Sequence, residues 1–143
     1  MKYIYDDGGR KAAGFKGTAD DCVCRAIAIA AQMPYTEAHR LVDEFSAVEV
    51  LRGRQKRHSG AETGVYKPLI REIMAHLGWR WVPTMSFGSG CKVHLRRSEL
   101  PKGRLVVNVS RHSVAVIDGV IHDTFDPSRG GMRCVYGYFA KEG

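Results

Sequence analysis

Hydrophobic residues recur at helical spacing in the first half of the chain and alternate with polar residues in its last third. Apolar residues three and four positions apart are typical of helices that bury one face, and strict alternation is typical of half-buried strands. The first half therefore predicts three helices, over residues 22–32, 37–48 and 65–77. The first of these follows Asp20 and Asp21, either of which can cap its free N–H groups, and it stops before Pro34.

Strand patterns begin the chain and dominate its last third. The predicted strands cover residues 2–5, 79–85, 104–110, 112–117, 120–125 and 133–139. Asp118-Gly119 suits a two-residue type I′ turn, so the strands on either side of it should form an antiparallel hairpin. Residues 49–64 are polar, basic and interrupted by glycine, which predicts a loop between helices. Helices followed by an antiparallel meander define an α+β fold, in one domain over residues 1–143.

The hairpin register brings a histidine and a carboxylate onto one face of the sheet. If the Asp-Gly pair forms the turn, paired residues and residues two apart point to the same side. One face then carries His112, Val114, Val116, Ile121, Asp123 and Phe125. Asp123 is a diagonal neighbour of His112, where a carboxylate can orient an imidazole base, whereas His122 and Asp126 point to the other face. A surface histidine near a surface aspartate is the plainer interpretation of the same pattern.

A cysteine at the start of the first helix is the candidate nucleophile. Cys22 would lie in the first turn, where free N–H groups and the helix dipole stabilise a thiolate. The alanines that follow allow this helix to pack closely on a sheet. The alternative for Cys22 is a buried structural cysteine. Cys24, about 200° further around the helix, is expected to be a core thiol, or a resolving cysteine for an oxidised Cys22.

Together, these features resemble the papain-like cysteine peptidases, in which a cysteine opens the first helix and a histidine and an acid follow on consecutive strands. The resemblance is strongest to the double-glycine leader peptidases of bacteriocin exporters, and it extends to small phage and bacterial proteins of the same design. It is carried by Asp21-Cys22, the segment RAIAIAA, His112 and the segment DGVIHD. It implies a papain-like α+β fold, with N-terminal helices packed on a C-terminal antiparallel β-sheet.

The resemblance also implies roles for individual residues. Cys22 corresponds to the nucleophile, His112 to the general base and Asp123 to the acid that orients the base. Asp126, which precedes a proline as the family's acid often does, is the alternative acid. The implied reaction is hydrolysis of an amide bond in a peptide or protein substrate, with no cofactor and no metal.

The chain departs from the family pattern at the oxyanion site. The family carries a glutamine a few residues before its cysteine, whereas this chain has GFKGTAD, with neither Gln nor Asn. The backbone N–H of Cys22 is then one expected oxyanion donor, and Lys16 or Thr18 is the candidate for a second. Loss of one such donor costs about 100- to 1000-fold in rate, so a slow enzyme, a differently built enzyme and a fold that has lost catalysis all fit the sequence.

The formal net charge of +7 favours anionic partners. The run LRGRQKRH and the pair Arg96-Arg97 could contact phosphates, but aromatic residues are not interleaved with them. A solvated basic surface is therefore favoured over a nucleic-acid site. The alternative to an enzyme is a non-catalytic binding protein, of phage origin, that uses this surface to bind a host protein or nucleic acid.

The sequence lacks a membrane-spanning run, an export signal and a zinc-binding spacing of cysteines, and these absences predict where the protein is located and whether it binds metal. No apolar run approaches the roughly 20 residues that cross a membrane, and the N-terminus lacks the apolar core of an export signal. These features predict a cytoplasmic protein without membrane contact, with its four cysteines reduced. Cys22 and Cys24 are too close for a typical zinc pair, and Cys91 and Cys134 stand alone, so no zinc site is expected. The sequence predicts no oligomeric state.

Overall fold

The computed structural model describes residues 1–143 except 18, 52–59, 63, 66, 87 and 142–143. The helices are α1 (Cys22–Ala30), α2 (Tyr35–Leu51), α3 (Lys67–His76) and the short 3₁₀ turn η1 (Arg97–Glu99). The strands are β1 (Lys2–Tyr5), β2 (Trp79–Pro83), β3 (Arg104–Val109), β4 (His112–Ile117), β5 (Val120–Asp123) and β6 (Gly137–Lys141). The predicted α+β class is confirmed.

The strands form one mixed sheet in the order β1-β5-β4-β3-β6-β2. β3, β4 and β5 make the predicted antiparallel meander, but β1 pairs with β5 in parallel. The prediction of a purely antiparallel, C-terminal sheet is wrong in this respect, since β1 and β2 come from earlier in the chain. Alternation of side chains reports which residues form a strand, but not which strand lies beside it or in which direction.

The β4–β5 hairpin has the register that its turn predicts. Ala115 pairs with His122, and the pairing continues one residue at a time toward the turn. The backbone φ angles are 49° at Asp118 and 78° at Gly119. Positive φ at both central positions is what a type I′ turn requires, and Asp-Gly adopts it readily. Local turn chemistry therefore fixes which residues of the hairpin share a face.

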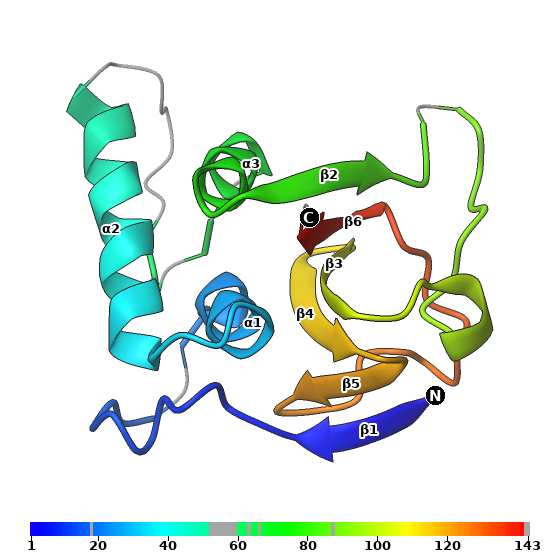
Figure 1. The fold of residues 1–143 in the computed structure, drawn as a ribbon, viewed down its shortest axis with the longest axis horizontal. Coiled ribbons are helices and arrows are strands. Elements are labelled where there is room, and N and C mark those ends of the chain that lie inside the picture. Colours follow the sequence, from blue (N-terminus) through cyan, green and yellow to red (C-terminus); the bar gives the residue numbers. More distant parts are fainter. Residues whose placement is uncertain (18, 52–59, 63, 66, 87, 142–143) are drawn as a thin grey trace.

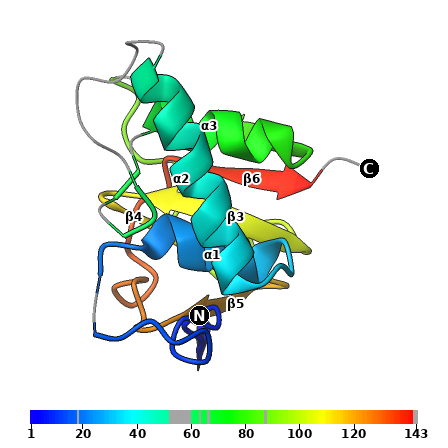
Figure 2. The same ribbon diagram turned by 90° about the vertical axis from the view of Figure 1, so that its left-hand side faces the viewer.

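The helices cover one face of the sheet in two layers. α1 and α3 lie next to the strands, and α2 packs across them on the outside (Figures 1 and 2). Ala26, Ile27 and Ala30 of α1 are buried in the apolar cluster that includes Ala115 of β4. Small side chains on this helix let its backbone approach the sheet, as the sequence predicts.

The opposite face of the sheet is covered by a loop rather than by a helix. Leu95 and Leu100, around η1, and Val135, before β6, form a second apolar cluster there with Val114 and Ile121. This segment passes on the side of the strands away from the helices (Figure 1). The central strands β3 and β4 are therefore buried on both faces.

Two predictions about local structure are wrong. Asp21 occupies the N-cap position of α1, yet its side chain makes no capping hydrogen bond, because it is bonded to other side chains. The last strand was predicted over residues 133–139 and is observed over Gly137–Lys141. The N–H of Val135 instead donates to the carbonyl of Val93, so the start of the predicted strand is drawn to the covering loop.

The prediction that all four cysteines are reduced is also wrong. Cys91 and Cys134 form a disulfide, with Cα atoms 5.8 Å apart, inside the usual range of about 4.4–6.8 Å. A β-bridge between His94 and Cys134 holds the two segments together. The absence of an apolar export signal, on which the prediction rested, carries no information on whether two thiols lie close together in the fold. Cys22 and Cys24 are free thiols.

The predicted basic loop over residues 49–64 is described only in part. α2 continues to Leu51, Gly60 bridges Gly64, and most of the basic run, residues 52–59, lies outside the described residues. Among the helices that the structure describes, none has the length and apolar character needed to cross a membrane.

Candidate active site

The ends of two neighbouring strands bring His112 and Asp123 together. His112 is the first residue of β4 and Asp123 is the last of β5. Their Nε2 and Oδ2 atoms lie 2.6 Å apart, a short charge-assisted hydrogen bond. The two side chains are only 9% and 4% exposed. The ring of Phe125, which follows the end of β5, lies 5.0 Å from the imidazole, measured between centroids.

Asp126, the alternative acid, has a different role in the structure. Its Oδ1 atom accepts a hydrogen bond of 2.9 Å from the N–H of Ser128, a local turn contact. The Asp123 carboxylate, in contrast, also accepts a 2.7 Å bond from the N–H of Thr124, which fixes its orientation toward His112. Of the two candidates, Asp123 is therefore the carboxylate that orients the ring.

Cys22 approaches the same imidazole from the start of α1. It is the first residue of the helix, half-buried, with a free thiol. Burial disfavours a charged imidazole, but hydrogen bonds to Asp123 and Cys22 and the charges of both groups outweigh it and raise the pKa of His112 to about 9. Because Nε2 faces Asp123, Nδ1 is the nitrogen left for the thiol. At neutral pH the ring is an imidazolium, the form that pairs with a thiolate.

The first turn of α1 leaves backbone donors beside the thiol. The first intrahelical bond runs from the N–H of Arg25 to the carbonyl of Asp21, so the N–H of Cys22 has no partner further back in the helix. Asp21 does not cap it with its side chain. The expected second donor is less well defined. Lys16 accepts a hydrogen bond from Arg10 through its carbonyl, and Thr18 lies outside the described residues.

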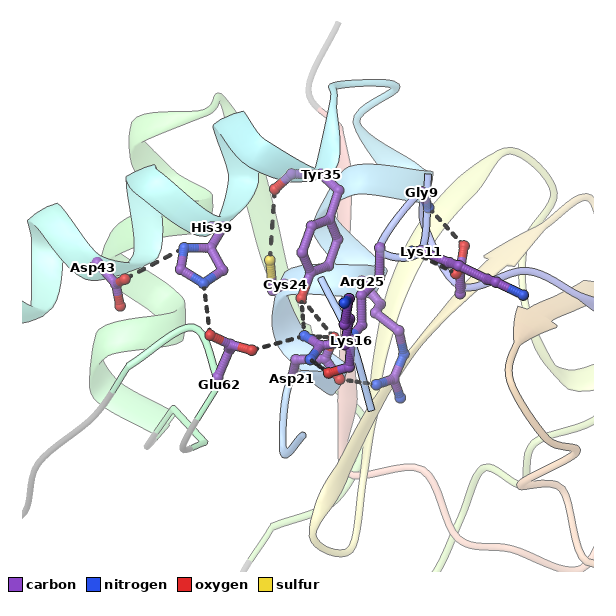
Figure 3. Close-up of polar contacts among 12 residues, drawn as sticks. Gly9, Lys11, Lys16, Asp21, Cys24, Arg25, Tyr35, His39, Asp43 and Glu62 are labelled. Carbon is purple, nitrogen blue, oxygen red and sulfur yellow. Dashed lines mark hydrogen bonds and ion pairs between the residues drawn. The ribbon is translucent and has the colours of Figure 1, made fainter. Parts of the chain in front are cut away.

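A buried charge network under the site was missed by the sequence reasoning (Figure 3). Asp21, only 1% exposed, contacts the guanidinium of Arg25 through Oδ1. Its Oδ2 atom accepts a 2.7 Å hydrogen bond from the hydroxyl of Tyr35 and lies 3.5 Å from Nη1 of Arg10. Burial and the bond to Asp21 raise the pKa of Tyr35, so its hydroxyl remains a donor. The network encloses the carboxylate next to the candidate nucleophile.

Arg25 connects this network to the candidate triad. Its Nη2 atom lies 3.5 Å from Oδ1 of Asp123, and its other terminal nitrogen contacts Asp21. One guanidinium therefore bridges the carboxylate that precedes the thiol and the carboxylate that orients the base. The sequence carried one signal for this contact, because Asp21 and Arg25 are four residues apart and such pairs meet on a helix surface.

The network extends to the outer helix through Arg10. Nη1 of Arg10 lies 3.0 Å from the carboxylate of Glu62, which is 3.2 Å from Nε2 of His39. Hydrogen bonds from His39 and Arg10 lower the pKa of Glu62. His39, to which the sequence assigned no partner, therefore belongs to the structure that holds the loop before α1 in place.

Cys24 is the core thiol that its helical position predicts. It is fully buried, and its sulfur contacts the carbonyl of Tyr35 at 3.9 Å. Burial, together with the negative charge of Asp21, raises the pKa of Cys24 to about 12. Its thiol is thus neutral at physiological pH and a poor nucleophile.

A cleft of about 710 Å³ adjoins the candidate triad. Its described lining comes from the end of β1, the loop before α1, the first turns of α1 and the residues after β5. Asp21 precedes Cys22 in sequence, and Phe125 packs against His112, so the cleft opens beside the reacting groups.

Two other kinds of site considered from the sequence are a metal site and a phosphate-binding site. Within the described ranges, no group of three or more His, Cys, Asp or Glu side chains could hold a metal ion. Arg96, a predicted phosphate contact, donates a hydrogen bond to the carbonyl of Gly131 and pairs with Glu99.

No protein-family model, curated protein or solved structure matches the chain.

Proposed function

We propose that the protein is a papain-like cysteine hydrolase that cleaves an amide or peptide bond through Cys22, His112 and Asp123. One observation carries the proposal. The imidazole of His112 lies between a free thiol at a helix start and a buried carboxylate 2.6 Å away, and both raise its pKa to about 9 against the effect of burial. This is the arrangement of an activated thiol nucleophile with its base and orienting acid.

The reaction proceeds through an acyl-enzyme. The thiolate of Cys22 attacks the substrate carbonyl carbon and forms a tetrahedral oxyanion. The imidazolium of His112 gives its proton to the leaving amine as the C–N bond breaks, which leaves a thioester. Neutral His112 then takes a proton from water, the hydroxide attacks the thioester, and the carboxylic acid leaves as the thiolate forms again. Asp123 holds the ring and stabilises its charged form in both steps.

The start of α1 supplies electrostatic stabilisation for this chemistry. The helix dipole and the free N–H of Cys22 favour negative charge on the sulfur and on the oxyanion. Asp21 would oppose both if it were unpaired, because its charge lies next to the thiol. Its contacts with Arg10 and Arg25 balance that charge.

The reactivity of Cys22 toward iodoacetamide tests the proposal. Labelling followed by mass spectrometry at pH 7 should modify Cys22 at least about tenfold faster than Cys24, which is buried and neutral. His112→Ala should slow Cys22 to the rate of an ordinary thiol. His122→Ala is the matched control, because His122 lies on the same hairpin but contacts Asp6. Equal, slow labelling of both thiols in the native protein would contradict the proposal.

Hydrolysis of a peptide mixture tests the reaction. The native protein should release new N-termini from a denatured protein digest, and Cys22→Ala should abolish the release. Asp123→Asn should reduce it strongly, whereas Asp126→Asn should not. If Cys22 reacts as an activated thiol and yet no peptide is cut, the alternative of a non-catalytic binding protein is favoured.

A further inference from the structure

We infer that the cleft beside the triad is the substrate site, and that it takes an extended peptide segment with acidic side chains. This inference rests on the proposed function and names the substrate class of the same site. It follows from three features of the cleft: its place next to the reacting groups, its rigid wall, and the charge and aromatic character of its exposed lining.

The cleft lies beside the candidate triad, although Cys22, His112 and Asp123 are not part of its lining. Arg25, one turn after Cys22, and Phe125, packed on His112, both line it. Tyr5, at the end of β1, forms part of the lining and pairs in register with Asp123. A substrate carbonyl held at the thiol therefore has its neighbouring residues directed into this cleft.

The loop before α1 forms a fixed wall of the cleft. Arg10 lines the cleft and is bonded to Tyr35 at 2.8 Å and to the carbonyl of Lys16 at 3.1 Å. Gly8 lies against the helix so closely that a Cβ atom there would be 3.2 Å from the backbone of Arg25. The wall is held by buried polar contacts to the helix that carries the nucleophile. Such a wall is preorganised, so that less conformational entropy is lost when a ligand binds.

The lining of the cleft carries more cationic than acidic side chains, with Arg10, Lys11, Lys16 and Arg25 against Asp7 and Asp21. Among the described residues that line the cleft, Asp7 and Asp21 are the acidic ones. Asp21 is enclosed by arginines, and Asp7 accepts hydrogen bonds from the N–H groups of Gly9 and Lys11. The side chains of Lys11 and Lys16 are exposed in the same lining, and no described acidic side chain pairs with them. An acidic substrate segment supplies the missing partners.

The other wall suits an extended peptide. Tyr5 and Phe125 are 67% and 48% exposed, and both line the cleft, where their rings can contact a bound peptide. β1 is an edge strand, and the N–H of Asp6 donates to the carbonyl of Asp123 at its inner side. Alternation along a strand then turns the backbone groups of Tyr5 outward, where an extended peptide can pair with them. Aromatic contact and strand pairing bind the chain, and the lysines select its charge.

Two peptidyl vinyl sulfones that differ only in the charge of three side chains test the inference. Two probes share an extended backbone and carry either three Glu or three Lys on the acyl side of the reactive group. Their rates of Cys22 modification are measured by intact-mass spectrometry at low and at physiological salt. The native protein should react about tenfold faster with the Glu probe, with the preference reduced by salt.

Reversing the charge of the cleft lysines tests whether they cause the preference for the Glu probe. Lys11→Glu combined with Lys16→Glu should invert the ratio of rates. Lys92→Glu combined with Lys102→Glu is the matched control, because these exposed lysines lie outside the cleft lining. Equal rates for the two probes in the native protein, or the same ratio in the Lys11/Lys16 variant, would overturn the inference.

Two measurements separate this inference from the proposed function. If iodoacetamide labels Cys22 rapidly and in a His112-dependent way while the probes show no charge preference, the hydrolase proposal stands and the substrate class is wrong. If the thiol of Cys22 is not activated, the vinyl sulfone probes do not report on the cleft. The preference of the cleft for an acidic peptide is then tested by peptide binding alone. Fluorescein-labelled versions of the two peptides, without the reactive group, are titrated into the Cys22→Ser protein by anisotropy. Tighter binding of the Glu peptide that is lost in the Lys11/Lys16 variant supports the cleft, and equal binding overturns it.

Discussion

The substitution Asp123→Asn isolates the part of the His112 pKa that comes from the orienting carboxylate. Asparagine has nearly the same shape and can still accept a hydrogen bond from Nε2, but it carries no charge. An opposite charge within about 4–6 Å typically changes a pKa by about 1–3 units. The carboxylate oxygen lies 2.6 Å from Nε2 and both side chains are largely buried. The pKa of His112, about 9 in the native protein, should therefore fall by about 1–3 units in the variant.

The raised pKa of His112 in the native protein also makes the free energy of unfolding depend on pH. His112 has a pKa of about 9 in the folded protein, above its ordinary value of 6.5. The stabilisation is therefore complete below pH 6.5 and is lost as the pH rises through about 9. At about 1.4 kcal/mol per pKa unit, this stabilisation amounts to roughly 3–4 kcal/mol. In Asp123→Asn, the loss of unfolding free energy with rising pH should be smaller and should occur at lower pH.

Two measurements test this reasoning. Proton NMR of the His112 ring between pH 5 and 10 reports its pKa directly, and urea unfolding at several pH values reports the free energy of unfolding. Asp126→Asn serves as the control, since its carboxylate bonds Ser128 instead. A His112 pKa that stays within about half a unit of the native value in Asp123→Asn would refute the assigned cause.

Three further substitutions test the structure around the site by urea unfolding. Arg25→Met leaves the buried carboxylate of Asp21 without its nearest cation, so it should cost about 3–5 kcal/mol, and an unchanged midpoint would contradict the bridging role. Ile27→Ala removes a fully buried side chain of α1 and should cost about 2–5 kcal/mol; a loss below about 1 kcal/mol would mean that the site is not packed as described. Gly137→Ala places a Cβ atom against the ring of Trp81 and should destabilise by about 1–3 kcal/mol, whereas neutral behaviour would show that the ring can move aside.

Local signals predicted the parts of the candidate site that lie close together in sequence. Asp118-Gly119 fixed the hairpin register, and that register correctly paired His112 with Asp123 rather than with Asp126. The position of Cys22 at the start of a helix followed from the apolar spacing after it and the acidic residue before it. A turn and a helix start are decided by a few consecutive residues, so a sequence can report them.

Contacts between distant segments were not predictable in the same way. Nothing in the strand KYIY indicates that it pairs in parallel with β5, and nothing around Cys91 and Cys134 indicates that they meet. Arg10 reaches Asp21 and Glu62 only because the chain folds back on itself. Such contacts depend on the final packing of whole elements, which alternation and spacing do not describe. The same limit explains why Asp21 was expected to cap a helix and instead binds arginines.

The parallel pairing of β1 with β5 has a consequence for the order in which the molecule assembles. Tyr5 leaves the ribosome well before its partner Asp123, which follows more than a hundred positions later in the chain. Closing such a long loop is slow, so β1 remains without its partner strand until β5 has formed. The nascent chain carries its thiol long before it carries its imidazole, and an activated sulfur can therefore arise only once His112 and Asp123 have been synthesised.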